Sequence, residues 1–273
     1  LGFFVSFGSM FKMSKYKANK LTLKTGEDLK NLRVSCARVA EVVRKVSAAV
    51  KPGVSTGELN ELAYKLITKN EGDVPAFLNY KPYGADYPFP GSICISVNEE
   101  VVHGIANHEK ILKEGDIVGL DCGIKHKGMI SDHAVTVAVG EIKPEIQELL
   151  EITKNALKAG IKAAKIGNHV NDISVAIESA IPKKYGIVKI LSGHGVGYKV
   201  HEEPYVPNFD DKVKGPKLVE GMVLAIEPMV NMGTDDVECL ADGYTFVTAD
   251  GKYSAHFEHT VLIGKDGGEI LTV

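Results

Sequence analysis

The 273-residue chain contains no tryptophan and only four cysteines. No two cysteines form a Cys-x-x-Cys pair, and all of them lie far apart in the sequence. This usage fits reduced thiols in a cytoplasmic protein better than a disulfide framework or a zinc cluster. The four residues are Cys36, Cys94, Cys122 and Cys239.

Long apolar runs are also missing. The opening segment LGFFVSFGSMF is too short to span a bilayer, and no basic stretch precedes it as in a signal peptide. We therefore expect no membrane association. The formal net charge is only −3, which gives no strong bulk attraction to nucleic acid, and we expect no direct DNA binding.

Residues 1–22 form the one basic segment, which we expect to be a flexible tail. Such a tail is most often simply solvated, and less often an anchor to an acidic partner such as ribosomal RNA. The lysines that make this N-terminal part of the chain basic are Lys12, Lys15, Lys17, Lys20 and, just after residue 22, Lys24.

Two pairs of segments repeat the same pattern. EGDIVGLD (114–121) and EGMVLAIE (220–227) each join a glycine turn to an apolar run, and they end in Asp121 and Glu227. SDHAVTV (131–137) and FEHTVLI (257–263) each place an acid and a histidine before an alternating apolar stretch, with Asp132 and Glu258 in matching positions. A third echo joins KPGVSTGEL (51–59) to KIGNHVNDI (165–173). The sequence predicts one domain over residues 23–273, built from two related halves at about 23–140 and 144–273. We also expect a monomer.

Four acids in matching places of two halves predict a metal centre. A pseudo-twofold axis would bring them together, and four buried carboxylates repel one another unless cations neutralise them. A single acid at the end of an apolar run is usually only a turn residue, but a matched quartet is not. We expect two divalent ions, with one acid of each half bridging them and the other binding terminally.

The order of elements predicts an α+β fold whose helices cover one face of a curved sheet. Thr25 and the pattern Ser55-Thr-Gly-Glu58 are typical helix starts. Residues 78–92 are rich in Pro, Gly and Tyr, which indicates a loop at the wall of a pocket. We expect helices ending near 49 and 68 and others at 144–165 and 168–181, with strands at 93–97, 116–124, 133–140, 187–191, 222–227 and 257–263.

Three histidines are candidates to join the acids. His194 in SGHGVG leads, because its flanking glycines let backbone approach closely. His103 in VVHGIA and His201 in VHEEP also lie beside strand or turn segments. Each of these two, taken alone, is more often a structural histidine than a functional one.

Five segments together resemble the type I methionine aminopeptidases in order and spacing, and the resemblance covers about residues 23–273. It implies a pita-bread fold with two pseudo-symmetric halves, and hydrolysis of the N-terminal methionine from nascent proteins and peptides that have a small second residue. The short segment between His194 and Glu227 favours type I over type II. The segments are NEEVVHGIA, GLDCGIKHKGMISDHAVTV, SGHGVGYKVHEEP, AIEPMV and FEHTVLI.

The resemblance also implies residue roles. Asp132 and Glu258 would bridge two ions of cobalt, manganese, iron or zinc. Asp121 would bind one ion terminally, and His194 and Glu227 would complete the other. Glu227 would shuttle the proton, His201 would stabilise the oxyanion and His103 would orient the scissile nitrogen. Implied substrate-binding residues are Cys94, His103, His201 and Tyr244, the last where relatives often have tryptophan.

Two alternatives remain open at this point. Prolidases and aminopeptidases P have a similar fold and are one alternative. They usually carry a separate N-terminal domain, whereas only about 22 residues precede the first expected helix here. A catalytically inactive protein of this fold could instead bind peptides or the ribosome. All five implied ligand positions are filled, which argues against loss of the metal centre.

Overall fold

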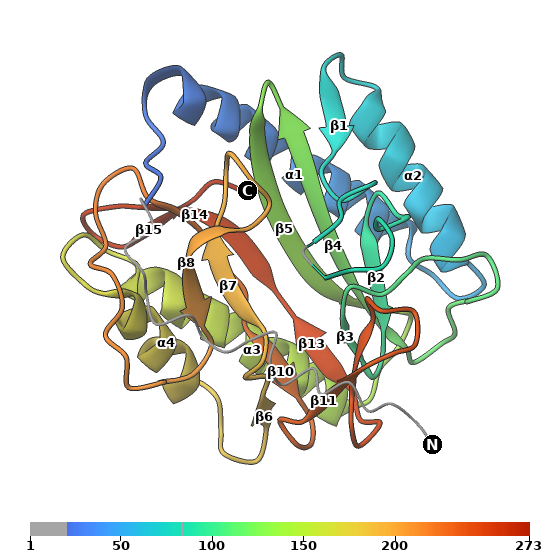
Figure 1. The fold of residues 1–273 in the computed structure, drawn as a ribbon. Coiled ribbons are helices and arrows are strands. Elements are labelled where there is room, and N and C mark those ends of the chain that lie inside the picture. Colours follow the sequence, from blue (N-terminus) through green and yellow to red (C-terminus); the bar gives the residue numbers. More distant parts are fainter. Residues whose placement is uncertain (1–20, 83) are drawn as a thin grey trace.

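The computed structural model describes residues 21–82 and 84–273. Its main feature is a nine-stranded sheet in the order β1-β4-β5-β14-β9-β7-β8, in which β2 also pairs with β4 and β15 with β14. Every pairing in this sheet is antiparallel. Figure 1 shows the long strands β4 and β5 curving. The nine strands are β1 (Asp73–Pro75), β2 (Cys94–Val97), β4 (Ile117–His126), β5 (Met129–Ala138), β7 (Ser192–Gly195), β8 (Glu202–Pro207), β9 (Val223–Ile226), β14 (Glu258–Ile263) and β15 (Gly268–Ile270).

Six short strands form two further sheets. One has the order β13-β10-β6 and the other β11-β12-β3. The β3 strand pairs with β12 and immediately precedes His103. Their bounds are β3 (Glu100–Val102), β6 (Gly186–Ile187), β10 (Met229–Asn231), β11 (Val237–Cys239), β12 (Phe246–Thr248) and β13 (Ser254–His256).

In Figure 1, helix α1 passes behind β4 and β5, and α2 lies beside β1 at the right of the view. The mixture of helices with antiparallel sheets confirms the predicted α+β fold. Helix α1 packs on β4 and β5, and α3 packs on β9, β10, β13 and β15. Leu120 and Cys122 of β4 are fully buried in the apolar cluster that α1 and α2 share, so Asp121 between them points to the opposite face. None of the helices within the described residues is long and apolar enough to cross a membrane. The helices are α1 (Gly26–Ala49), α2 (Thr56–Thr68), α3 (Pro144–Ala163) and α4 (Val170–Ser179).

The third sequence echo has matching geometry in the two halves. Gly53 and Gly167 both have positive φ, at 91° and 97°. The Gly53 N–H donates to the Leu112 carbonyl at 2.8 Å, and the Gly167 N–H donates to the Leu218 carbonyl at 3.1 Å. Each accepting leucine lies two residues before the glutamate of the EGD or EGM turn. The repeated letters therefore correspond to repeated backbone contacts.

The two segments of the second repeat, 131–137 and 257–263, lie side by side at the centre of the sheet, where β5 pairs with β14. His133 pairs in register with His259, and their rings stack with centroids 4.8 Å apart and planes 11° apart. The acids that precede them, Asp132 and Glu258, are thereby held on adjacent strands. The division into a tail of residues 1–22 and one domain of two halves stays a prediction.

Several predicted strands have different bounds in the structure. The strand expected at 133–140 begins at Met129, so Asp132 lies inside a strand and not before it. The strand expected at 187–191 covers only Gly186–Ile187. Strands β7 and β8 were not expected, because glycine and proline disfavour strands when neighbours are ignored. Pairing with β9 decides the conformation of β7.

Lys24 was expected in the basic tail, and this prediction is wrong. Its side chain is only 1% exposed, and its Nζ lies 2.7 Å from Oε2 of Glu202. The segment before α1 is thus part of the folded structure at this residue. The other lysines of the segment, Lys12, Lys15, Lys17 and Lys20, lie outside the described residues.

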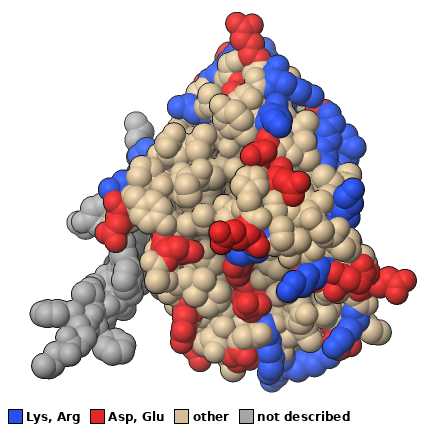
Figure 2. All heavy atoms as spheres, turned by 90° about the vertical axis from the view of Figure 1, so that its right-hand side faces the viewer, with Lys and Arg blue, Asp and Glu red and all other residues tan. Residues whose placement is uncertain are grey.

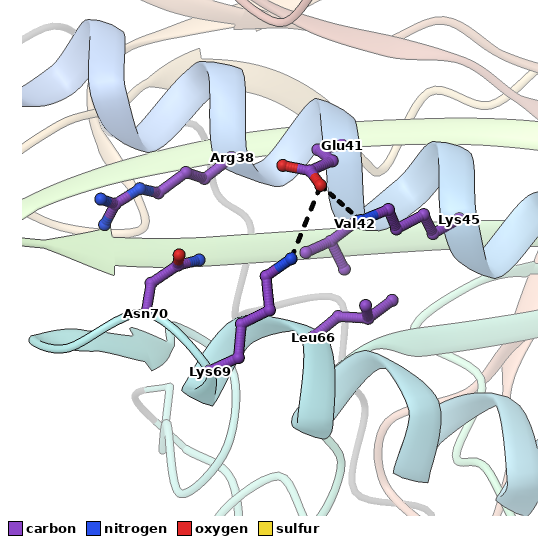
Figure 3. Close-up of a pocket in the computed structure, with 7 residues that line it drawn as sticks. All are labelled: Arg38, Glu41, Val42, Lys45, Leu66, Lys69 and Asn70. Atoms are coloured by element: carbon purple, nitrogen blue, oxygen red, sulfur yellow. Dashed lines mark hydrogen bonds and ion pairs between the residues drawn. The ribbon is translucent and has the colours of Figure 1, made fainter.

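Charges of both signs are interspersed on the face shown in Figure 2. Figure 3 shows a pocket between α1 and α2 that is lined by charged side chains of both signs. There Glu41 lies 2.5 Å from Lys45 Nζ and 3.6 Å from Lys69 Nζ. Exposed ion pairs of this kind contribute little to the free energy of unfolding. The Glu41 carboxylate does offset part of the positive charge of Lys45 and Lys69.

The N-cap of α2 provides a test of local stability. The Ser55 hydroxyl accepts the Glu58 N–H at 3.1 Å, and the Glu58 carboxylate accepts the Ser55 N–H at 2.8 Å, as the capping box predicts. We expect Ser55→Ala to lower the free energy of unfolding by about 1 kcal/mol, measured by urea denaturation. Thr25 caps α1 without a side-chain hydrogen bond, so Thr25→Ala is the matched control. Equal losses in the two variants would contradict this account.

Candidate metal and catalytic site

Strand register places three acids on one face of the sheet. Residues directly opposed on antiparallel strands project to the same face, and successive residues alternate. Asp121 of β4 and Glu258 of β14 both lie opposite Ala134 of β5. Asp132 of β5 lies opposite Gly123 of β4, two residues from Asp121. These carboxylates therefore share the face that the helices leave free.

His194 and Glu227 reach the same face from the second half. His194 of β7 lies opposite Ala225 of β9, and Glu227 follows Ala225 by two residues. A Cβ added at Gly193 would lie 2.4 Å from the Ala225 carbonyl oxygen, and one at Gly195 would lie 2.5 Å from a carbonyl oxygen of β8. The two glycines thus permit the close approach that the sequence predicted around His194.

The side chains converge in a buried cluster. One potential ligand atom each of Asp132, His194 and Glu258 lies within 4.8 Å of the others. Nε2 of His194 lies 3.3 Å from Oε1 of Glu227, and burial and the charges of Asp121 and Glu227 together raise the pKa of Asp132. Asp132, His194 and Glu258 are each at most 5% exposed. The structure therefore brings all five predicted ligands together.

Electrostatics of the cluster favour a bound cation. Burial raises the pKa of Asp121 to about 6. Burial, reinforced by neighbouring carboxylates, raises the pKa of Asp132 and that of Glu258 well above their usual values. Among the described residues, Asp121 Oδ1, Asp132 Oδ1 and Glu258 Oε1 are buried without a hydrogen-bond partner. Oxygen atoms in this state, beside an imidazole, fit divalent transition-metal ions.

His256 completes the surroundings of Glu227 and was missed from the sequence. It is 3% exposed, and its Nε2 lies 3.4 Å from Oε2 of Glu227. Glu227 thus lies between His194 and His256. The available signal was spacing, because His256 precedes Glu258 by two residues and an extended chain places such residues on one side. The sequence did not predict the β13 strand, so this spacing alone did not identify His256 as a site residue.

His201 lies against the metal-ligand candidates. Its ring centroid is 4.5 Å from that of His194, with the planes nearly perpendicular. Its Nδ1 lies 3.0 Å from the Tyr80 hydroxyl. His201 is exposed to solvent, and desolvation by the protein around its ring lowers its pKa to about 4, so the ring is neutral at pH 7. A neutral imidazole in this place can donate one hydrogen bond to a developing negative charge.

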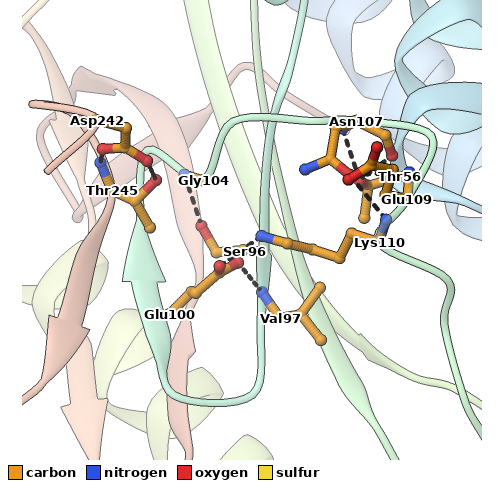
Figure 4. A network of polar contacts seen from close by, with 10 residues as sticks. All are labelled: Thr56, Ser96, Val97, Glu100, Gly104, Asn107, Glu109, Lys110, Asp242 and Thr245. Carbon is orange, nitrogen blue, oxygen red and sulfur yellow. Dashed lines mark hydrogen bonds and ion pairs between the residues drawn. The ribbon is translucent and has the colours of Figure 1, made fainter. Parts of the chain in front are cut away.

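His103 is held in an uncommon conformation just after β3. Its φ is +59°, a value that non-glycine residues rarely adopt and that often marks functional sites. The adjacent Gly104 N–H donates to Ser96 Oγ of β2 at 3.1 Å, and Glu100 accepts the Val97 N–H at 2.8 Å (Figure 4). Burial lowers the pKa of His103 to about 3. Hydrogen bonds between the segments around β2 and β3 therefore hold the backbone beside a neutral imidazole.

Apolar and aromatic side chains form a wall near the acids. Cys94 lies opposite Asp121 in the β2–β4 register. It shares a buried apolar cluster with Tyr244 and Phe89, whose rings are 5.2 Å apart. Tyr87 packs edge-on against Tyr244 at 5.3 Å. As predicted, the described residues of 78–92 form a loop, and its aromatic residues support the wall.

Comparison with known proteins agrees with this geometry. The profile of metallopeptidase family M24 matches residues 30–265. A methionine aminopeptidase of Aquifex aeolicus is 47% identical over 256 residues, which cover 92% of this chain and 98% of the relative. The crystal structure of a Thermotoga maritima methionine aminopeptidase is 39% identical with a TM-score of 0.86, covering 92% of this chain and 99% of that one.

A prolidase of Pyrococcus furiosus is also similar, with a TM-score of 0.70 and 25% identity. The match covers 92% of this chain but only 65% of the prolidase. Methionine aminopeptidases therefore match at higher identity and over nearly their full length. The chain belongs to the type I, bacterial-type methionine aminopeptidases of metallopeptidase family M24, and it has their α+β pita-bread fold.

Proposed function

We propose that this chain hydrolyses the peptide bond after an N-terminal methionine, and that it prefers substrates with a small second residue. The observation that carries the proposal is the buried cluster of Asp132, His194 and Glu258, on a chain that matches methionine aminopeptidases over nearly its whole length. The aromatic and apolar wall beside Cys94 and Tyr244 supports a pocket for an unbranched, sulfur-containing side chain.

Two divalent ions would be held by five side chains. Asp132 and Glu258, on the adjacent central strands, would contact both ions, Asp121 would bind the first, and His194 and Glu227 would bind the second. Bound ions of this kind polarise a carbonyl and lower the pKa of water. Cobalt, manganese, iron and zinc all suit one imidazole among four carboxylates. The unpartnered oxygens of Asp121, Asp132 and Glu258 support this assignment.

Glu227, His201 and His103 would act on the substrate. Glu227 would take a proton from water and pass it to the leaving amine, because its carboxylate lies between His194 and His256 beside the other candidate ligands. His201 would donate a hydrogen bond to the oxyanion, and His103 would orient the scissile nitrogen. Their low pKa values keep both rings neutral, so neither adds positive charge beside the cations.

The setting that we propose is the cytoplasm, where the substrates are nascent chains. All four cysteines are unpaired, which supports a reducing compartment. A monomeric state and a ribosome contact through the basic tail stay predictions, and the lysines of that tail up to Lys20 lie outside the described residues.

A peptide panel tests the reaction. We expect the metal-free protein, reloaded with each candidate ion, to release methionine from Met-Ala-Ser and to leave Ala-Pro peptides intact. Peptides with leucine or arginine in the second position should be cleaved much more slowly. Chromatography of the released amino acid is the measurement. Cleavage of Ala-Pro alone would favour a prolidase-type activity, and binding of Met-Ala-Ser without cleavage would favour an inactive binding module.

Asp132→Asn tests the bridging role. The amide removes a negative charge from the centre of the cluster, so we expect metal occupancy and activity to be lost together while the circular dichroism spectrum is retained. Metal content after gel filtration and methionine release are the two measurements. Asp236→Asn, at an exposed position, is the control and should change neither. Full turnover by the Asp132 variant would contradict the assignment.

His201→Ala tests the oxyanion donor. We expect a loss of about 2.7–4 kcal/mol of transition-state stabilisation, or on the order of 10²–10³-fold in kcat, with KM little changed. Steady-state kinetics on Met-Ala-Ser measure both parameters. His108→Ala removes an exposed histidine paired with Glu61 and serves as the matched control. A change confined to KM would argue for a binding role of His201.

A further inference from the structure

Glu202, the residue after His201, closes the turn that carries this histidine. Its Oε1 accepts the backbone N–H groups of Tyr198 and Lys199, the latter at 2.9 Å. Its side chain is only 4% exposed. A carboxylate buried inside a turn fixes the turn's conformation, provided that its charge is matched. The position of His201 therefore depends on what neutralises Glu202.

Lys24 supplies the matching charge from the other end of the chain. Its Nζ lies 2.7 Å from Glu202 Oε2 and 2.9 Å from Thr22 Oγ1, and the Thr22 hydroxyl also donates to Glu202. The two charged side chains are 1% and 4% exposed. Burying an ion pair costs desolvation energy, so the pair of Lys24 and Glu202 need not stabilise the fold. Its presence therefore points to a role other than stability.

Lys24 also joins the turn to two other parts of the site. Its backbone N–H donates to the Gly221 carbonyl at 2.8 Å, in the turn that leads through β9 to Glu227. Its Nζ lies 5.4 Å from the ring centroid of Tyr198, whose hydroxyl donates to Asp28 of α1 at 2.7 Å. Residues 21–24 thus connect α1, the β9 turn and the turn of His201.

We propose that Lys24 and Glu202 are a positioning pair that holds His201 in its productive place. The inference rests on the proposed function, since it assigns the pair to the oxyanion donor of that reaction. Neither side chain touches the substrate in this account. Their effect is on the turn of residues 198–202, and through it on the His201 ring.

A double-mutant cycle tests the proposal in the full-length, metal-loaded enzyme. We expect Lys24→Met to lower kcat on Met-Ala-Ser by about ten- to a hundredfold, the scale of a small misplacement of a catalytic group, with KM changed less than about twofold. In a His201→Ala background the same substitution should change kcat less than about twofold, because its target is already absent. Equal losses in both backgrounds would overturn the proposal.

Amide hydrogen exchange provides a readout that does not depend on activity. In Lys24→Met we expect faster exchange at residues 198–203 and unchanged exchange in β4 and β5. Unchanged exchange in the turn, or faster exchange throughout the protein, would also overturn the proposal. If the parent enzyme released no methionine from the peptide panel, the proposed function would be wrong. The hydrogen-exchange experiment would still show whether Lys24 holds the turn of residues 198–202.

Two further variants guard against simple unfolding. Lys24→Met leaves Glu202 buried without its partner, so Lys24→Met/Glu202→Gln removes both charges while keeping an acceptor for the Tyr198 and Lys199 amides. We expect the double variant to fold and to recover part of the lost kcat. Arg33→Met breaks an exposed pair of α1 with Glu269 and should leave kcat and exchange of the turn unchanged.

Discussion

Repulsion and desolvation among buried carboxylates are the constraint around which this structure is organised. Asp121, Asp132, Glu227 and Glu258 lie on one face of an antiparallel sheet, and burial raises the pKa of each. A flexible loop would relax such a cluster by exposing it to water. Paired strands hold their side chains in register, so the acids stay close until protons or cations bind. A bound cation would relieve the repulsion among the carboxylates, so this repulsion favours metal binding.

The duplicated halves explain how the sheet meets this constraint and why the site is not symmetric. Thr260 of β14 donates its hydroxyl to the Asp132 carbonyl at 2.7 Å and accepts the Asp132 N–H at 3.0 Å, so the two central strands are locked at the acids. Most of the imidazoles come from the second half, which supplies His194, His201 and His256. The first half contributes His103, whose backbone has a positive φ of 59°.

Local sequence could predict the features that depend on short range. The capping box of Ser55 and the alternation around Asp121 each reflect contacts within a few residues, and the repeats revealed which acids belong together. Long-range pairing decided the rest. Strand β7 is rich in glycine and becomes a strand only beside β9, and Lys24 resembles a tail residue until Glu202, 178 residues later, is placed beside it. His256 gained meaning only once the fold brought it to Glu227.

Tyr244 is held in the wall of the site by the loop of residues 78–92. Phe89 packs edge-on against Tyr244, and the Tyr244 hydroxyl donates to the Tyr87 carbonyl. In return, the Tyr87 hydroxyl donates to the Asp242 carbonyl at 2.6 Å. These reciprocal hydrogen bonds tie the loop to the turn that carries Tyr244. Each phenolic hydroxyl group thus anchors its ring to the backbone of the other segment while the ring itself remains in the apolar wall.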